Sequence, residues 1–239
     1  MEDQSNMENY YIHKQNKLLL QLDLENQVDT DKLHLIAGVD LAYWKENERE
    51  YAVCCIVVLN YHTKVVIERK YDYDQIAVPY IPGCLAFREI PLVMKTVREL
   101  EDEPDLYVFD GNGYLHPRHM GLATHAGILL NKPSIGVAKS YFKVENVDYT
   151  EPENECFAYK DIVIHDEVFG RALRTQKNVK PIFLSVGNKV DLQTSMEVIK
   201  NMVNNESHIP LPTRLADLMT HEKRREYQCN SGIMGKEKF

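Results

Sequence analysis

The sequence predicts an α/β domain with a mixed sheet, in which three antiparallel strands are followed by parallel strands, flanked by helices. Two observations support this prediction. Three apolar segments joined by short links, at residues 33–43, 51–60 and 63–71, have the pattern of an antiparallel meander. After them, helical and extended segments alternate along the chain.

The first half of the chain gives the clearest elements. Apolar residues among polar ones predict a helix over residues 8–26. The segment 51–60 is almost wholly apolar, so we expect it to be buried on both faces. Residues 60–63 predict a hairpin turn. Pro91 suits a first helical position, and the helix that it opens is expected to run toward Pro104.

The second half continues the alternation. The expected elements are a strand at 105–110, a helix at 119–130, a strand at 134–138 and extended stretches at 161–175 and 181–186. Residues 145–157 are acidic and polar and predict a long surface loop. Asp191 is expected to cap one helix, and Pro212 to open the last one. This order is that of a ribonuclease H-like core, in which the first and fourth strands lie side by side.

Composition excludes several classes of protein. The chain has 239 residues and 44% apolar residues, without an apolar run long enough for a transmembrane helix, so we expect a soluble globular protein with no membrane partner. Residues 1–9 lack the layout of a signal peptide. The cysteines number five, with no Cys-x-x-Cys pair, which predicts reduced thiols. We therefore expect a cytoplasmic monomer, with the nucleus as an alternative location.

The charge distribution gives a mixed indication. A net charge of −8 argues mildly against a nucleic-acid partner, although a metal site concentrates acids by design. Basic residues cluster at 171–180 and again at 223–225. Such clusters are usually solvated surface, and contact with phosphate by the first cluster is the alternative interpretation.

Three carboxylates stand where a strand stops or a helix starts. Asp40 and Asp110 end apolar strands, and Glu89 directly precedes Ile90-Pro91. A single acid at such a place is usually a turn or cap residue. If the three converge, they form an oxygen-rich cage for a hard cation such as Mg²⁺, with Mn²⁺ as a substitute. That chemistry suits phosphodiester cleavage.

Several motifs together resemble the endonuclease V family and occur in that family's order. They are Gly38–Tyr43, Pro79–Gly83, Leu85–Glu89, Asp110–Gly113, His116–Arg118 and Gly136–Ser140. The resemblance runs from about Leu33 to Ala216. It implies a hydrolase that cuts a phosphodiester one nucleotide 3′ of inosine, in nucleic-acid repair or RNA processing. Bacterial members act mainly on deoxyinosine in DNA, whereas animal members prefer inosine in RNA.

The resemblance also implies catalytic roles for individual residues. Asp40, Glu89 and Asp110 look like the metal-binding catalytic acids. Lys139 is similar in position to an active-site lysine that could stabilise the scissile phosphate. His116 could bond a phosphate or the nucleophilic water.

A further set of residues is expected to contact the nucleic acid. Tyr80 looks like a wedge that fills the space left by a flipped base, held outward by the flanking prolines. Glycines would let the backbone approach the base, and Leu85 would pack on its face. The full set is Pro79, Tyr80, Ile81, Pro82, Gly83, Leu85, Gly111, Gly113, Gly136 and Lys139.

One residue departs from the family pattern. The chain reads Ser185-Val186-Gly187-Asn188 where the family usually has histidine at the last position. An amide cannot take a proton at neutral pH, so Asn188 raises the alternative of an inosine-binding protein without turnover. A nuclease of the same fold with another structure-specific target is the other alternative.

The expected domain organisation follows from the resemblance. Residues 31–227 would form one catalytic domain, with an N-terminal helix and acidic lead at 1–30 packed on it and a disordered tail at 228–239.

Overall fold

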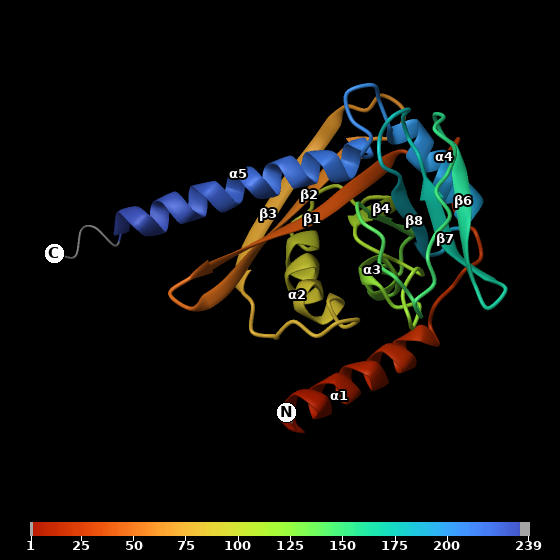
Figure 1. Ribbon diagram of the computed structural model, residues 1–239. Coiled ribbons are helices and arrows are strands. Elements are labelled where there is room, and N and C mark those ends of the chain that lie inside the picture. The colour runs from red at the N-terminus through yellow and green to blue at the C-terminus, as the bar shows by residue number, and fades with distance from the viewer. Residues whose placement is uncertain (1, 235–239) are drawn as a thin grey trace.

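The computed structural model describes residues 2–234, which fold into one open sheet with helices on both faces (Figure 1). Within these residues the sheet has eight strands, in the order β3-β2-β1-β4-β5-β8-β7-β6. Its first three strands, β1 (Leu35–Glu46), β2 (Arg49–Asn60) and β3 (Val66–Gln75), form the predicted antiparallel meander. The expected ribonuclease H-like mixed sheet is confirmed.

Two short strands continue the sheet in parallel with β1. They are β4 (Leu106–Asp110) and β5 (Ser134–Ala138). Val39 of β1 pairs with Phe109 of β4, so the next residues along the two strands are Asp40 and Asp110. The predicted neighbourhood of the first and fourth strands is therefore confirmed.

The remaining strands return antiparallel. β8 (Ile182–Asn188) pairs with β5, β7 (Glu167–Leu173) pairs with β8, and β6 (Tyr159–Ile164) forms the sheet edge. The stretch predicted as extended at 161–175 is thus a hairpin. Two positive-φ residues in its turn, at 165 and 166, give the backbone the twist that a tight hairpin needs.

The helices begin and end somewhat differently from the prediction. Their bounds are α1 Glu2–Leu19, α2 Ala86–Val97, α3 Leu122–Leu130, α4 Leu192–Met202 and α5 Leu211–Met234. α2 starts before Pro91, because its first turn buries Ala86 and Ile90 in the core. α5 continues past the expected end at 227, and the rest of the predicted tail, 235–239, lies outside the described residues.

Two apolar cores sandwich the sheet. On one face α5 packs on alternate residues of β1 and β2, and α4 packs on β8. On the other face α2 packs on β2 and β3, and α3 packs on β4, β5 and β8. A side chain at Gly38 would collide with the backbone of Pro212, 2.1 Å from its ideal Cβ, so the start of α5 lies directly on β1. This contact carries the next turn of α5 over the end of the strand.

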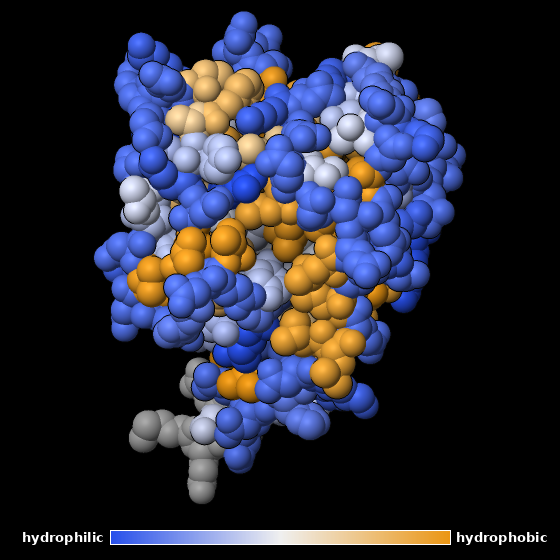
Figure 2. Space-filling model, turned by 90° about the vertical axis from the view of Figure 1, so that its right-hand side faces the viewer, coloured by the Kyte–Doolittle hydropathy of each residue, from blue (hydrophilic) through white to orange (hydrophobic). Residues whose placement is uncertain are grey.

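The face of the molecule in Figure 2 is largely hydrophilic. On the face shown in Figure 2, apolar residues gather in patches near the middle and the lower right, among mostly polar neighbours. No helix in the described part of the chain is long and apolar enough to cross a membrane.

Candidate active site

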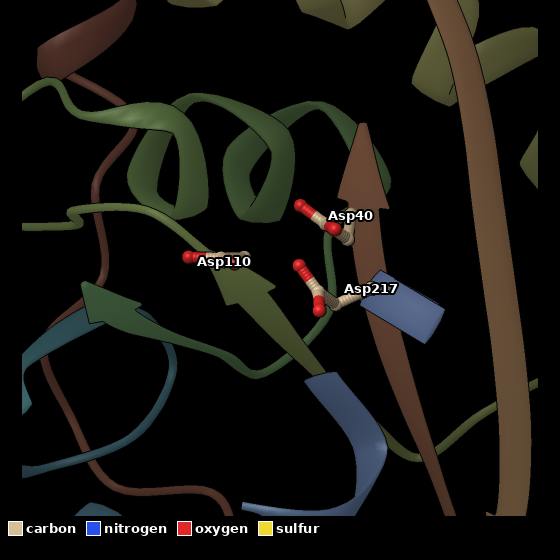
Figure 3. Close-up of side chains that lie close together, drawn as sticks. All are labelled: Asp40, Asp110 and Asp217. Carbon is tan, nitrogen blue, oxygen red and sulfur yellow. The ribbon is translucent and has the colours of Figure 1, made fainter. Parts of the chain in front are cut away.

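Three carboxylates meet at the ends of β1 and β4. Asp40 extends from β1, Asp110 from the end of β4, and Asp217 from α5 (Figure 3). One carboxylate oxygen of each lies within 4.8 Å of the others. Two of the three predicted acids therefore come together, but the third member of this acidic cluster is Asp217 instead of Glu89.

The cluster is electrostatically unfavourable when no cation is bound. Asp40 is only 8% exposed and accepts a hydrogen bond from the Thr220 hydroxyl at 3.3 Å. Burial, followed by the charge of Asp110, raises the pKa of Asp40 to about 8, although Lys139 opposes the shift. Burial also raises the pKa of Asp110. A divalent cation would remove this mutual repulsion.

Lys139 follows β5 and bridges two of the acids. Its Nζ lies 2.6 Å from Asp110 Oδ2 and 2.8 Å from Asp217 Oδ1. Partial burial alone would lower the pKa of Lys139, but these two hydrogen bonds outweigh burial and raise it. The ammonium group is therefore a fixed positive charge within the cluster.

Glu89 approaches from the other face of the sheet. It lies in α2, which packs opposite α5, so its carboxylate does not join the acidic cluster. The Tyr43 hydroxyl donates to Glu89 Oε1 at 2.7 Å, while Oε2 is buried and lacks a hydrogen-bond partner among the described residues. Burial raises the pKa of Glu89 to about 7 against the opposing effects of Tyr43 and Arg88.

An apolar pocket adjoins the acidic cluster and shares Asp110 with it. The pocket has a volume of about 140 Å³, and an apolar cavity of about 150 Å³ holds benzene, so a flat ring fits. Its walls are mainly apolar or glycine, with a few polar groups. They comprise Tyr80, Gly83, Leu85, Ala86, Glu89, Asp110, Gly111, Asn112, His116, Met120, Gly121, Leu122 and Phe142.

The segment expected to form the wedge leads into a tight turn at the rim of this pocket, in which the Cys84 N–H donates to the Ile81 carbonyl at 2.9 Å. Tyr80 is 58% exposed, and the flanking Pro79 and Pro82 are exposed as well. Ile81 is different, because only 2% of it is exposed and it anchors the turn in the protein. The side chain of Ile81 is therefore not exposed, and its contact with nucleic acid stays a prediction. Gly83 closes the turn at φ +73°, a conformation that favours glycine.

Two of the predicted glycines pack against protein instead of lining the pocket. An ideal Cβ on Gly136 would lie 2.4 Å from the Gly113 nitrogen, and one on Gly113 would lie 2.1 Å from the Val186 carbonyl oxygen. These glycines let the loop after Asp110 lie flat against β5 and β8. In this structure they seat the loop, and their approach to a base stays a prediction.

His116 lines the pocket but has no free ring nitrogen. Its Nδ1 accepts from the backbone N–H groups of Arg118 and Met120, at 3.2 and 3.3 Å, so Nε2 carries the proton and donates to the Gly83 carbonyl at 3.0 Å. Burial, with the nearby Arg118 charge, lowers the pKa of His116 to about 4. The predicted bond from His116 to a phosphate or water is not supported.

Asn188 lies at the opposite end of the strands from the acidic cluster. It pairs with Ser134, whereas Asp110 pairs with Val137, a separation of about 10 Å along the strand. Its buried amide donates to the Gly127 and Lys132 carbonyls and accepts from the Asp23 N–H. The alternative that Asn188 abolishes turnover stays a hypothesis, and in this structure the residue ties β8 to α3 and to the segment after α1.

The two arginines of the first basic cluster are engaged in contacts within the protein, whereas Lys177 and Lys180 are exposed. Arg171 pairs with Asp161 at 2.8 Å. Arg174 is buried and binds Glu151 and the Val179 carbonyl. These two arginines therefore do not form an open phosphate-binding surface.

Comparison with known proteins gives one consistent family. The family model described as Endonuclease V matches residues 16–218. Endonuclease V of Bacillus thuringiensis subsp. konkukian is 57% identical over 89% of this chain and 90% of its own. The crystal structure of endonuclease V from Bacillus subtilis is 49% identical, with a TM-score of 0.91, and the match covers 93% of this chain and 94% of that one.

A third relative was crystallised with a nucleic acid. The Ciona intestinalis endonuclease V is 27% identical, with a TM-score of 0.83, and the match covers 93% of this chain and 99% of that one. Its crystal structure contains a 24mer DNA with an inosine followed by a ribo-adenosine.

The raised pKa of Asp40 predicts a pH-dependent stability. Folding takes up a proton between about pH 4, where an unfolded aspartate titrates, and about pH 8, so the free energy of unfolding should fall as pH rises across that window. One proton contributes at most about 1.4 kcal/mol per pH unit. Denaturant titrations of metal-free protein should detect this fall, and millimolar Mg²⁺ should offset it at the alkaline end.

The matched control is the exposed hairpin residue Asp166. Asp40→Asn should flatten the pH dependence in that window, because a neutral amide removes the buried charge, whereas Asp166→Asn should keep the wild-type curve. An Asp40→Asn protein whose stability still falls as steeply as that of wild type would contradict the account of the cluster.

The contacts of Asn188 predict a structural effect of its substitution. Asn188→His should lower the free energy of unfolding by about 1–3 kcal/mol, because three hydrogen bonds of a buried side chain, one fully and two partly buried, are lost or strained. Nuclease activity per folded molecule should stay within about twofold of wild type, since the residue is remote from the acids. A large gain in rate, measured alongside urea unfolding, would show that Asn188 acts in catalysis.

Proposed function

The chain belongs to the endonuclease V family, whose members are nucleases, and on that premise we propose that it is a magnesium-dependent endonuclease that cuts a phosphodiester 3′ to inosine. The observation that carries this proposal is that Asp110 belongs both to the acidic cluster and to the apolar pocket. A base bound in the pocket therefore brings the phosphates next to it within reach of the acids.

The residues of the cluster fit a hard divalent cation. All three offer carboxylate oxygens, the ligands that Mg²⁺ and Mn²⁺ prefer. The raised pKa of Asp40 supports the same conclusion, because the repulsion that causes it disappears when a cation binds. When bound there, the metal would orient the attacking water and offset the negative charge of the leaving oxygen. Glu89, on the pocket side of Asp110, is a further acid that could orient water.

Lys139 supplies a second positive charge. Its ammonium group already lies between Asp110 and Asp217, so it can shift toward a phosphate oxygen once a cation neutralises the acids. An ammonium at this point would stabilise the charge that develops on the phosphate during cleavage.

The pocket supports recognition of a flipped base. Its apolar walls suit the faces of a purine ring, and the exposed ring of Tyr80 at the rim suits stacking in the gap that the base leaves. The inosine-containing DNA bound by the Ciona intestinalis relative agrees with such a substrate. Inosine pairs weakly, so it leaves the stack at a lower energetic cost, which favours it over ordinary bases.

The two alternatives differ in what supports them. The alternative of an inosine-binding protein without turnover rests on Asn188, and the distance of that residue from the acids argues against this alternative. A different structure-specific target stays testable by replacing inosine in the substrate. We expect a monomer, because the cluster and the pocket are both built from one chain.

The acidic cluster should be essential for cleavage and dispensable for binding. Asp110→Asn and Asp40→Asn each remove an anionic ligand while keeping the shape of the side chain, so single-turnover cleavage of an inosine oligonucleotide in Mg²⁺ should be abolished. Affinity for the same oligonucleotide should persist, because base and phosphate contacts lie elsewhere. Cleavage near the wild-type rate by either variant would refute the assignment.

Tyr80 should contribute to binding through its ring. Tyr80→Ala should weaken binding to an inosine oligonucleotide by about 1–3 kcal/mol, the value of one stacked base, while Tyr80→Phe should have a mild effect. Fluorescence anisotropy with matched oligonucleotides that carry inosine or adenosine measures both. Equal losses in the two variants would implicate the hydroxyl and exclude a stacking role.

A further inference from the structure

The N-terminal helix α1 reaches the pocket through one buried side chain. Gln15 is 1% exposed, although its neighbours Lys14 and Asn16 are exposed. It precedes residue 16, where the match to the family model begins. A fully buried amide on a helix whose exposed side is polar must be held by specific partners, since burial without hydrogen bonds is costly.

Two of those partners, Gly83 and Met120, belong to the walls of the pocket. Gln15 Nε2 donates to the Gly83 carbonyl at 2.9 Å and to the Met120 carbonyl at 3.4 Å. Gln15 Oε1 accepts from Arg118 Nε at 2.6 Å. Because Arg118 can only donate, the amide has one acceptable orientation, with its oxygen toward the guanidinium and its nitrogen toward Gly83.

The Gly83 carbonyl is the focus of this network. Besides Gln15, it accepts from an Arg118 guanidinium nitrogen at 2.7 Å and from His116 Nε2 at 3.0 Å. A carbonyl oxygen has two lone pairs, so three donors saturate it and fix its peptide plane. The same residue holds the positive φ on which the turn depends. Fixing this peptide therefore fixes the turn at residues 81–84, which directly follows Tyr80 and is called the Tyr80 turn below.

We infer that Gln15 is a positioning residue for the Tyr80 turn, so that α1 takes part in capture of the base. This inference rests on the proposed function, in which Tyr80 stacks in the duplex. A turn that already has its bound conformation in the free protein loses less conformational entropy when the nucleic acid binds. This smaller entropic cost makes binding tighter.

A second contact of α1 makes it possible to distinguish a positioning role of Gln15 from a purely structural one, in which Gln15 only attaches the helix to the domain. The rings of Tyr11 in α1 and Phe87 in α2 stack with centroids 4.3 Å apart. Replacing Gln15 leaves this contact intact, so α1 can remain docked while the hydrogen bonds to Gly83 and Arg118 are lost.

Two substitutions test the inference in the full-length protein. Gln15→Met keeps the length of the side chain and removes all its hydrogen bonds. Gln15→Glu keeps an acceptor for Arg118 but replaces the donor to Gly83 with an oxygen. Each should raise the Kd for an inosine oligonucleotide by about five- to tenfold, the effect expected for about one lost buried hydrogen bond. The single-turnover rate at saturating protein should fall much less. Asn16→Ala, on the exposed side of the same helix, should bind like wild type.

A double-mutant cycle with Tyr80→Ala decides whether Gln15 acts through the turn. Gln15→Met should add little to the loss caused by Tyr80→Ala, because the wedge that it positions is gone. Additive losses, or wild-type affinity in both Gln15 variants while Tyr80→Ala binds weakly, would overturn the inference. If Tyr80→Ala itself binds like wild type, the wedge assignment in the proposed function fails, and the inference fails with it.

Discussion

Asp40, Asp110 and Asp217 repel one another, and the scaffold must hold them together against that repulsion. Two of them are fixed by the parallel pairing of β1 with β4, which sets their backbones side by side. The third comes from α5, which lies close to β1 because Gly38 has no side chain in the way. Lys139 offsets part of the repulsion. The scaffold thus holds three carboxylates close together, and binding of a divalent cation would relieve their repulsion.

The same strand ends also hold the apolar pocket, and Asp110 joins the two. Beyond Asp110, the loop is seated by the close packing of Gly113 and Gly136, so that the pocket wall lies directly against the sheet. On the opposite rim, the Tyr80 turn is held by hydrogen bonds that converge on Gly83. In the proposed function, these short segments would couple recognition of the base to cleavage.

Much of this arrangement could be predicted from local sequence, and the failures share a cause. Asp40 and Asp110 were predictable because apolar strands end at them and strand order brings them together. Asp217 could not be predicted in this way, because an acid on a helix is usually solvent-exposed. Its place beside Asp40 and Asp110 follows only from the face of the sheet on which α5 packs. The position of Glu89 outside the acidic cluster was unpredictable for the same reason, because α2 packs on the other face of the sheet, and its role as a metal ligand stays a prediction. Asn188 resembled a catalytic position only in the linear motif.

The most direct test of the central claim maps the cut on a defined substrate. End-labelled DNA and RNA oligonucleotides of one sequence, each with a single inosine, should be incubated with the protein in Mg²⁺ and in excess chelator. The account predicts cleavage in Mg²⁺ alone, at one phosphodiester on the 3′ side of inosine, in at least one of the two nucleic acids, and no cut in controls with adenosine or guanosine. Cutting that ignores the inosine, or none in either nucleic acid, would contradict it.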